Sequence, residues 1–401
     1  MKILQVVAST SPSAGGPIEG VLQTSRWSTA AGNSVELLTL DDPAAPEIAT
    51  CALRVNAVGP VSSTFGYTKS LLRWLRQNAA SYDVVVVNGL WQYLTYAVWK
   101  ALKTTGTPYV VFPHGMLDPY FKQASPIKHL KKAIYWSLIE RKVLQDAAAV
   151  AFTCEEERAL ARQTFPGFSV REAVVGYGTS MPEVDLAGAG KAFLDAYPRL
   201  TGKRLVLFIS RIHPKKGCDL LLKAFAARLA ADPAWYLVMA GPDQVGWQAE
   251  LAKLSTTLGI EDRVVWTGML RDTLKWGAFA TAEVFALPSH QENFGIAVVE
   301  ALACGLPVLI SHKVNIWQEI MACGAGLCAA DTVEGASSML NEWSEINASQ
   351  RETMRAAAQL CFERHFEARA TSAALDALLL KCVGEKRSGP AQKAPRSHQT
   401  V

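Results

Sequence analysis

The sequence contains little that suits a chain crossing or leaving a membrane. No stretch approaches the roughly 20 consecutive apolar residues that span a bilayer, and the apolar run beginning at Met1 is too short for a signal peptide. Charged residues account for only 19% of the 401 residues and hydrophobic residues for 50%, which is typical of a folded chain. We therefore expect a folded, cytoplasmic protein.

Several signatures of other protein classes are also absent. None of the eight cysteines forms a Cys-x-x-Cys pair, so we expect buried, reduced thiols and no zinc site. The Gly-x-Gly-x-x-Gly fingerprint of nicotinamide dehydrogenases is missing, and segment 188–192 lacks the first glycine and the final Ser or Thr of a P-loop. The net charge of +4 is mild and the two signs are well mixed, so nucleic acid is not an expected partner.

What the sequence does contain is a repeated alternation of short apolar runs with helical patterns. The runs are apolar on both faces, as in Val84–Val87, which is typical of strands covered on both sides in a parallel sheet. Strands are expected at residues 2–8, 34–40, 83–88, 108–113 and 147–153, and in a second series at 204–210, 235–241, 263–267, 283–288 and 306–311. The alternation predicts an α/β chain with two Rossmann-like doubly wound domains facing each other across a cleft.

Length and composition suggest where the domains begin and end. A chain of 401 residues suits two cores of roughly 150–200 residues each, and segment 176–190 is rich in glycine and turn residues, as a linker would be. We expect an N-terminal domain over 1–185 and a C-terminal domain over 200–365. A helix over 366–382 is expected to pack back across both, followed by a disordered tail over 383–401.

Segment 289–308 (SHQENFGIAVVEALACGLPV) is the most informative part of the chain. It leaves an apolar strand, enters a helix and ends at Gly305 and Pro307. A helix N-terminus offers free amides and a partial positive charge that suit a diphosphate. The flanking carboxylates of Glu292 and Glu300 can accept hydrogen bonds from sugar or ribose hydroxyls. A helix cap and a solvated carboxylate would explain either glutamate alone, but not the whole string.

Segment 209–217 (ISRIHPKKG) follows the first strand of the second series and leads into a helix. Arg211 can grip phosphate oxygens with its planar fork, and Lys216 supplies a point charge. Cations at a helix start oppose the helix dipole, so a bound anion explains them better than solvent alone.

Two segments of the first series carry signals at strand ends. In segment 13–17 (SAGGP), Gly15 and Gly16 allow close approach of a phosphate to the backbone, although an ordinary strand-to-helix turn explains the segment equally well. His114 ends a buried strand beside Gly115, at an edge where a ligand is expected. A lone histidine is more often structural than catalytic, so only its position at the strand end makes His114 a candidate site residue.

Together these segments resemble the retaining glycosyltransferases of family four, which have the GT-B fold. The pattern of that family is two glutamates separated by seven residues and followed by Ala-x-Ala-x-Gly-x-Pro-Val. It is matched here from Glu292 to Val308, with Leu302 between the two alanines. The resemblance covers the chain to about residue 380 and is most specific in the second half.

The resemblance implies roles for the matched residues of the second half. Glu292 is implied to face the donor sugar and Glu300 to hold the ribose hydroxyls. Arg211 and Lys216 are implied to neutralise the departing nucleoside diphosphate. The backbone of three further residues is implied to lie beside the sugar and diphosphate: Asn293, Phe294 and Gly295.

Other matches carry weaker implications. The loop with Gly15 and Gly16 resembles the glycine loop of the family, which reaches over the donor diphosphate. His114 is implied to contact the donor sugar or the reacting centre, and Gly241 and Gly268 to lie near the base.

These implications predict a metal-independent hexosyltransferase. The sequence has no Asp-x-Asp pair to hold a metal, and Arg211, Lys216 and a helix dipole can supply the same charge stabilisation. No metal and no cofactor are therefore expected, only a nucleoside-diphosphate sugar as donor. We expect transfer to a hydroxyl with retention at the anomeric carbon. Related enzymes extend lipid-linked sugars, which favours a polyprenyl-diphosphate-linked saccharide acceptor in exopolysaccharide, capsule or lipopolysaccharide assembly.

Two other functions stay open. One is the same transfer to a small soluble acceptor. The other is a non-catalytic nucleotide-sugar-binding protein with the same fold, which loss of Arg211, Lys216 or Glu292 would have favoured; all three are present.

Residues 122–142 combine six cations with two aromatic residues and an apolar stripe at helical spacing, formed by Ile127, Leu130, Ile134 and Leu138. We expect the stripe to pack on the sheet, as in an ordinary amphipathic helix. We expect the cationic face to contact an anionic membrane surface, which would make the protein peripheral at the inner face of the cell membrane.

Overall fold

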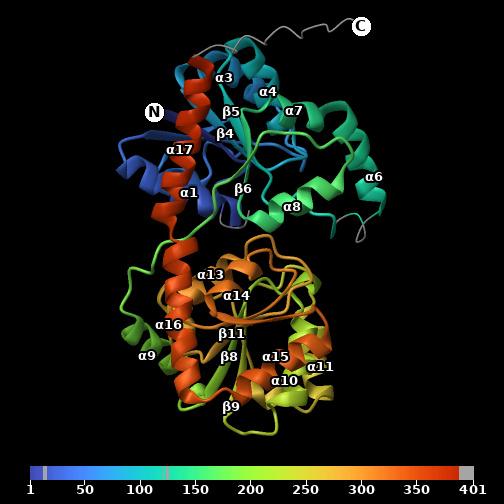
Figure 1. Ribbon diagram of the computed structural model, residues 1–401, viewed down its shortest axis with the longest axis vertical. Helices are drawn as coiled ribbons and strands as arrows, with labels where there is room; N and C mark the ends of the chain where they lie inside the picture. Colours follow the sequence, from blue (N-terminus) through green and yellow to red (C-terminus); the bar gives the residue numbers. More distant parts are fainter. Residues whose placement is uncertain (12–15, 121, 123–125, 388–401) are drawn as a thin grey trace, which may run out of the picture. The chain divides into compact units, whose positions relative to one another are not determined.

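The computed structural model describes residues 1–11, 16–120, 122 and 126–387. The chain divides into two compact units (Figure 1). The first comprises residues 1–176 and the segment that begins at Thr371, and the second comprises Tyr177–Ala370. Each unit is a parallel sheet covered by helices.

In the described residues, the first unit has a seven-stranded sheet in the order β3-β2-β1-β4-β5-β6-β7. Its strands are β1 (Lys2–Val6), β2 (Ser34–Thr39), β3 (Arg54–Ala57), β4 (Val84–Asn88), β5 (Tyr109–Phe112), β6 (Ala149–Phe152) and β7 (Glu172–Val174). Its helices are α1 (Gly16–Ala30), α2 (Pro46–Thr50), α3 (Lys69–Asn78), α4 (Tyr93–Thr105), α6 (Pro126–Tyr135), α7 (Arg141–Asp146), α8 (Glu155–Thr164) and α17 (Ala368–Arg387), with a 3-10 turn, η2 (Ala79–Ser81), and a π-helical turn, η3 (Trp136–Glu140). The strand order reverses between β1 and β4, and ligands of open α/β sheets bind at such a switch point.

Helices cover both faces of this sheet, and successive side chains of a strand point to opposite faces, so the side chains on both faces are buried. Val84 and Val86 of β4 belong to one apolar cluster, which is completed by Leu375 and Leu379 of α17. Val85 and Val87 belong to the other cluster, which is completed by side chains of α3, α4 and α7. This arrangement explains why the strand consists of consecutive valines.

The C-terminal helix α17 belongs largely to the first unit, where it lies beside α1 (Figure 1). Ser372 donates a hydrogen bond to the carbonyl of Thr24 in α1 (2.9 Å), and Asp376 accepts one from Ser28 (2.8 Å). The helix runs to Arg387 rather than to 382, so the first five residues of the expected disordered tail, 383–387, are helical. The remainder of that expected tail, 388–401, lies outside the described residues.

The second unit contains, in its described residues, a six-stranded sheet in the order β10-β9-β8-β11-β12-β13. Its strands are β8 (Arg204–Ile209), β9 (Trp235–Ala240), β10 (Val264–Gly268), β11 (Val284–Leu287), β12 (Val308–Ser311) and β13 (Gly326–Ala329). Its α-helices are α9 (Leu186–Ala196), α10 (Cys218–Arg228), α11 (Gln248–Thr257), α12 (Asp272–Thr281), α13 (Ile296–Ala303), α14 (Trp317–Cys323), α15 (Val333–Glu345) and α16 (Ala348–His365), and its 3-10 turns are η4 (Pro198–Leu200), η5 (Pro214–Lys216) and η6 (Glu261–Arg263). The switch point lies between β8 and β11. The two sheets confirm the predicted pair of Rossmann-like doubly wound domains.

The expected linker over 176–190 is only partly a connection. The division between the units falls after Gly176, and residues from Leu186 onward form α9. One glycine of α9, Gly190, and one of α12, Gly277, allow these two helices to pack closely. A Cβ on Gly277 of α12 would lie 2.2 Å from the carbonyl oxygen of Ala189, and one on Gly190 would lie 3.2 Å from Cγ2 of Thr281.

Candidate active site

Two predicted residues, Lys216 and Glu292, meet at the switch point of the second sheet. Lys216 follows β8 and Glu292 follows β11, and these strands pair in parallel with Val206 opposite Val284. The Lys216 Nζ forms an ion pair with Glu292 Oε2; the lysine side chain is 6% exposed and the glutamate side chain 21%. Strand pairing thus brings together a cation and a carboxylate that lie far apart in the sequence.

The loops that carry this ion pair are also joined through their backbones. The amide of His290 donates to the carbonyl of Lys215 (2.8 Å). Gly217, which follows Lys216, has φ +66°, and a Cβ there would lie 2.2 Å from the carbonyl oxygen of Pro288. Only glycine therefore allows the loop after β8 to lie this close to the loop after β11.

Arg211 lies on the same loop as Lys216 but is exposed to solvent. Its Nη1 donates to Oε1 of Gln244, in the loop after β9 (3.2 Å). The pKa of nearby His213 is lowered by burial and then by the charges of Arg211, Lys215 and Lys216. Three cations therefore act at one strand end, and such a concentration of positive charge suits a diphosphate.

The N-terminus of α13 adds to this positive field. The helix begins at Ile296, and the residue before it, Gly295, has φ +76° and no side chain that could cap the helix. Its first amides are thus presented at the carboxyl end of β11, where an anion can bind them. Glu292 and Asn293, which precede this turn, are held by hydrogen bonds to the loop after β12. The amide of Glu292 donates to the carbonyl of Lys313 (2.8 Å), and Asn293 Oδ1 accepts from Asn315 Nδ2 (3.3 Å).

Phe294 contributes to this turn through its backbone, since its ring is buried in the unit. The ring centroid lies 5.0 Å from that of Tyr177 and 5.8 Å from that of Phe366, in edge-on contacts. The buried ring anchors the turn, so Phe294 can meet a ligand at the start of α13 only through its backbone.

Glu300, in the middle of α13, has a partner that the sequence did not reveal. Its Oε1 accepts from Lys275 Nζ of α12 (2.8 Å), and its side chain is 11% exposed. Lys275 itself is 24% exposed. The lysine thus orients the carboxylate of Glu300.

Gly241 and Gly268 lie at the carboxyl ends of β9 and β10. The amide of Gly241 donates to the carbonyl of Gly268 (2.8 Å). A Cβ on Gly241 would lie 1.7 Å from the carbonyl oxygen of Ser210, so the position has no room for a side chain. Gly268 has φ +66° with no atom within 4 Å of such a Cβ, so it leaves open space at this edge.

In the first unit, His114 lies at the carboxyl edge of the sheet, just after β5. It has φ +48°, is half-buried, and its ring stacks on Phe112 with centroids 5.5 Å apart. Its Nε2 lies 2.9 Å from Oδ1 of Asn88 at the end of β4. Because the Asn88 amide donates to Gln5 Oε1 (3.0 Å), Oδ1 faces the histidine as an acceptor and Nε2 carries the proton. Burial lowers the pKa of His114 to about 4, so the ring is neutral near pH 7.

A buried carboxylate, Glu157 of α8, holds the backbone of this loop. Its Oε1 accepts from the amide of Gly115, and its Oε2 accepts from the amide and hydroxyl of Thr153 (both 2.7 Å). Neither Glu157 nor Asn88 was predicted as a site residue. Asn88 had a signal, since it is the polar residue that ends an all-valine strand.

Other predicted features are placed as follows. Gly16 begins α1 directly after the loop that follows β1, whereas Gly15 lies outside the described residues. Across residues 1–11, 16–120, 122 and 126–387, no group of three or more His, Cys, Asp and Glu side chains could hold a metal ion. No helix in that part of the chain is long and apolar enough to span a membrane.

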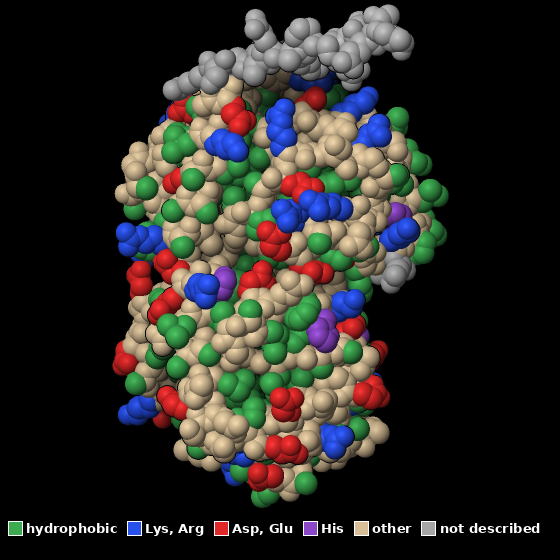
Figure 2. Space-filling model, viewed as in Figure 1, with side chains coloured by type: hydrophobic (Ala, Val, Ile, Leu, Met, Phe, Trp, Pro, Cys, Tyr) green, Lys and Arg blue, Asp and Glu red, His purple; other side chains and the backbone are tan. Residues whose placement is uncertain are grey.

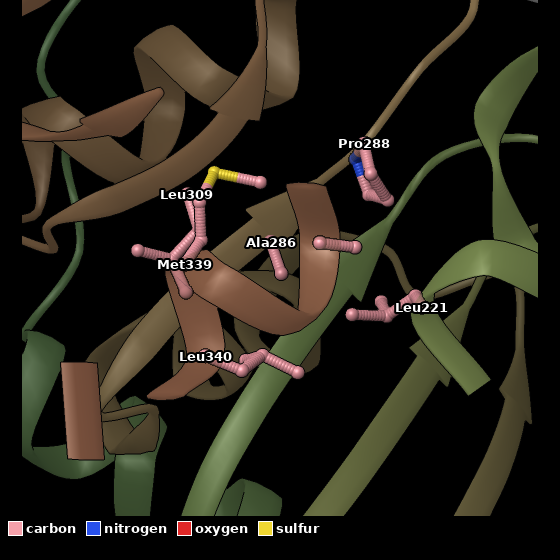
Figure 3. A pocket seen from close by; sticks show the side chains of 7 residues that line it. Leu221, Ala286, Pro288, Leu309, Met339 and Leu340 are labelled. Atoms are coloured by element: carbon pink, nitrogen blue, oxygen red, sulfur yellow. The ribbon is translucent and has the colours of Figure 1, made fainter. Parts of the chain in front are cut away.

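The second unit also contains a small apolar hollow (Figure 3). It is lined by Leu221, Ala286, Pro288, Leu309, Ala336, Met339 and Leu340. It contains no side chain that could bind phosphate or a sugar hydroxyl, so it is a packing space and not a donor site.

The prediction for the apolar stripe of α6 is wrong. Its aliphatic side chains are 57–75% exposed: Ile127, Leu130, Ile134 and, in η3, Leu138. Other residues of α6 and η3 face the unit. The rings of His129 and Trp136 stack on Phe165, with centroids 4.9 and 5.0 Å apart. In Figure 2, hydrophobic side chains and cations share the outer rim where Figure 1 labels α6.

Comparisons with known proteins match both units. The family model "Glycosyl transferase 4-like domain" matches residues 15–178, which include His114. The model "Glycosyl transferases group 1" matches residues 192–360, which include Lys216 and Glu292.

Individual relatives and structures agree with the family models. A GDP-mannose:cellobiosyl-diphosphopolyprenol alpha-mannosyltransferase of Xanthomonas campestris is 28% identical over 373 residues, covering 88% of this chain and 91% of that protein. A D-inositol 3-phosphate glycosyltransferase of Rhodococcus opacus is 30% identical over 185 residues, 44% of this chain and 41% of that one. The structure of Anabaena HepE in complex with UDP and glucose has a TM-score of 0.77 at 20% identity, covering 95% of this chain and 100% of that one. The chain therefore belongs to the family-four glycosyltransferases, with the GT-B fold.

Proposed function

We propose that the protein transfers a hexosyl group from a nucleoside-diphosphate sugar to a hydroxyl of a polyprenyl-diphosphate-linked saccharide, with retention at the anomeric carbon. The observation that carries the proposal is the Lys216–Glu292 pair at the switch point of the second sheet, next to the uncapped start of α13. The donor class is supported by the UDP and UDP-glucose complexes of the Anabaena protein. The acceptor class is supported by the name of the Xanthomonas relative.

Arg211 and Lys216 are assigned to the leaving diphosphate. An ammonium has three N–H donors, so Lys216 can keep Glu292 and donate to a phosphate oxygen at the same time. The exposed guanidinium of Arg211 can bind two phosphate oxygens in its planar fork. With the dipole of α13, these cations supply the charge stabilisation that a divalent metal would otherwise supply, so we propose that turnover needs no metal.

The carboxylates and His114 are assigned to orientation of the substrates. Glu292 is assigned to hydroxyls of the transferred sugar and Glu300 to those of the ribose. His114, neutral near pH 7, is assigned to a hydrogen bond with a sugar hydroxyl and not to proton transfer. As the bond from the anomeric carbon to the phosphate oxygen breaks, the bond to the acceptor oxygen forms on the same face. The acceptor proton passes to the leaving diphosphate.

We assign α6 to an anionic membrane surface on the cytoplasmic side. Its exposed aliphatic stripe can enter the boundary between headgroups and acyl chains, and the exposed Lys128, Lys131 and Lys142 can attract lipid phosphates. This assignment replaces the expectation that only the cationic face meets the membrane. A lipid-linked acceptor would be presented at that surface.

The transfer itself is tested with purified protein in EDTA. The donors are GDP-mannose and UDP-glucose, and the acceptors are polyprenyl-diphosphate-linked cellobiose and free cellobiose. We expect one donor to yield a trisaccharide on the lipid-linked acceptor, with the anomeric configuration of the donor by NMR.

An inverted product, or transfer that needs added Mn²⁺, would contradict the mechanism. Equal rates on free cellobiose would favour the small soluble acceptor. Binding of a donor without any transfer would favour a non-catalytic protein.

A further inference from the structure

Two aromatic side chains of the first unit, separated by one glycine in the sequence, are exposed. Phe65 is 41% and Tyr67 56% exposed, in the loop between β3 and α3. A single exposed apolar side chain is ordinary, but exposed rings that lie together can form a binding surface. The loop around them is rich in hydroxyl side chains: Ser62, Ser63, Thr64 and Thr68.

The two rings are held in place by one buried ring. The centroid of Tyr93, which begins α4, lies 6.1 Å from that of Phe65 and 4.8 Å from that of Tyr67. The amide of Tyr93 also donates to the carbonyl of Phe65 (2.7 Å). Between the rings, Gly66 has φ +74°, and a Cβ there would lie 2.7 Å from Cδ1 of Leu40. The backbone of the loop is therefore held in place by these contacts, and the two rings are exposed in a defined position.

The position of the rings in the fold associates them with the functional edge of the sheet. Phe65 follows β3, Tyr93 follows β4, and Tyr135 of α6 follows β5; the Phe65 and Tyr135 centroids lie 6.1 Å apart. Three crossover segments thus contribute to one aromatic cluster beyond the carboxyl ends of parallel strands, the edge that also carries Asn88 and His114.

We propose that Phe65 and Tyr67 form the surface on which the saccharide of the acceptor stacks. This proposal rests on the proposed function, because it names the place of the acceptor of that reaction. A pyranose ring presents C–H groups on its face and hydroxyls at its rim, which match aromatic rings on a loop that is rich in hydroxyl side chains. The neighbouring stripe of α6 is aliphatic and flanked by lysines, which suits the lipid part of the acceptor and the membrane instead.

The proposal is tested by saturation-transfer NMR with a panel of free disaccharides: cellobiose, maltose, lactose and mannobiose. The variants are Phe65→Ala and Tyr67→Ala, with Tyr67→Trp as a replacement that keeps a ring. Met269→Ala, at a 52% exposed position of the second unit, is the matched control. Binding of GDP and UDP by thermal shift, and binding to anionic vesicles, are measured on the same samples.

We expect at least one disaccharide to receive saturation from the wild-type protein, with a Kd that rises about fivefold in each alanine variant. Tyr67→Trp and Met269→Ala should bind as the wild type does. The absence of transfer to every disaccharide, or transfer unchanged in both alanine variants, would overturn the proposal. So would a loss of vesicle binding in those variants with saccharide binding intact, because the rings would then be membrane anchors. If the saccharide proposal fails but GDP or UDP still raises the melting temperature, the proposed donor site stands. If neither nucleotide raises the melting temperature of the wild type, the proposed function itself fails.

Discussion

Removal of two leucines from the exposed stripe of α6 and η3 should release the protein from membranes without unfolding it. Leu130 and Leu138 are 64% and 63% exposed, so little of either side chain supports the folded unit. We consider the double variant Leu130→Ser, Leu138→Ser, which keeps every lysine of the region. Its thermal stability should equal that of the wild type.

The expected loss of membrane affinity follows from the exposed fractions. Full burial of a leucine side chain is worth about 2 kcal/mol. Because roughly three fifths of each side chain is available to the membrane, the two leucines together contribute about 2.5 kcal/mol to partitioning. Their removal should therefore weaken binding about 60-fold at constant charge.

The assay is co-sedimentation with vesicles that contain an anionic phospholipid, at two salt concentrations. The control is Val245→Ser, Met269→Ser, which changes two residues of the second unit that are 53% and 52% exposed. Wild type and control should bind alike, and added salt should weaken both because it screens the lysines. Equal binding by the leucine variant would refute the assignment of α6 to the membrane.

Three further predictions concern single residues. Arg211→Ala should lower kcat in EDTA about 100- to 1000-fold with an unchanged melting temperature, since its side chain is exposed; near-normal turnover would refute its role. Because burial lowers the pKa of His114 to about 4, kcat/KM should show no inflection from this residue between pH 5.5 and 8; an inflection near pH 6.5 that disappears in His114→Asn would contradict a neutral ring. Burial raises the pKa of Glu140 to about 7 from 4.5, so the folded protein should lose about 3 kcal/mol of stability as the pH rises between these values and none above pH 7. Glu140→Gln should remove this pH dependence of stability, so the variant should melt higher than the wild type at pH 8 but not at pH 4.5. The same dependence of melting temperature on pH in both proteins would contradict the raised pKa of Glu140.

The fold was predictable where strands are buried on both faces. The inner strands β4, β8 and β11 carry uninterrupted apolar runs, such as Val84–Val87, and begin and end within a few residues of the expected limits. Three strands were not predicted: β3, β7 and β13. All three are short edge strands. β3 (RVNA) and β7 (EAV) contain polar residues that interrupt the apolar pattern, and β13 (GLCA) consists mostly of small residues without the β-branched and aromatic side chains typical of strands.

The candidate site was predictable as a set of residues but not as a set of contacts. The motifs marked Lys216 and Glu292, but their ion pair depends on the parallel pairing of β8 with β11, which no local pattern encodes. Lys275 had no local signal, because a single lysine on a surface helix is unremarkable until its partner Glu300 is known. The amphipathic pattern of α6 was also correct, but periodicity does not say which face the rest of the unit covers.

The central claim is that the switch point of the second sheet binds a nucleoside diphosphate without a metal. The most direct measurement is calorimetric titration of GDP and UDP, in EDTA, into the wild type, Lys216→Met and Lys253→Met. Lys253 lies exposed on α11 and serves as a control of equal charge change. We expect one nucleotide to bind the wild type and Lys253→Met alike and to bind Lys216→Met at least about tenfold more weakly. Equal affinity in all three proteins, or binding that appears only with added Mn²⁺, would contradict the account.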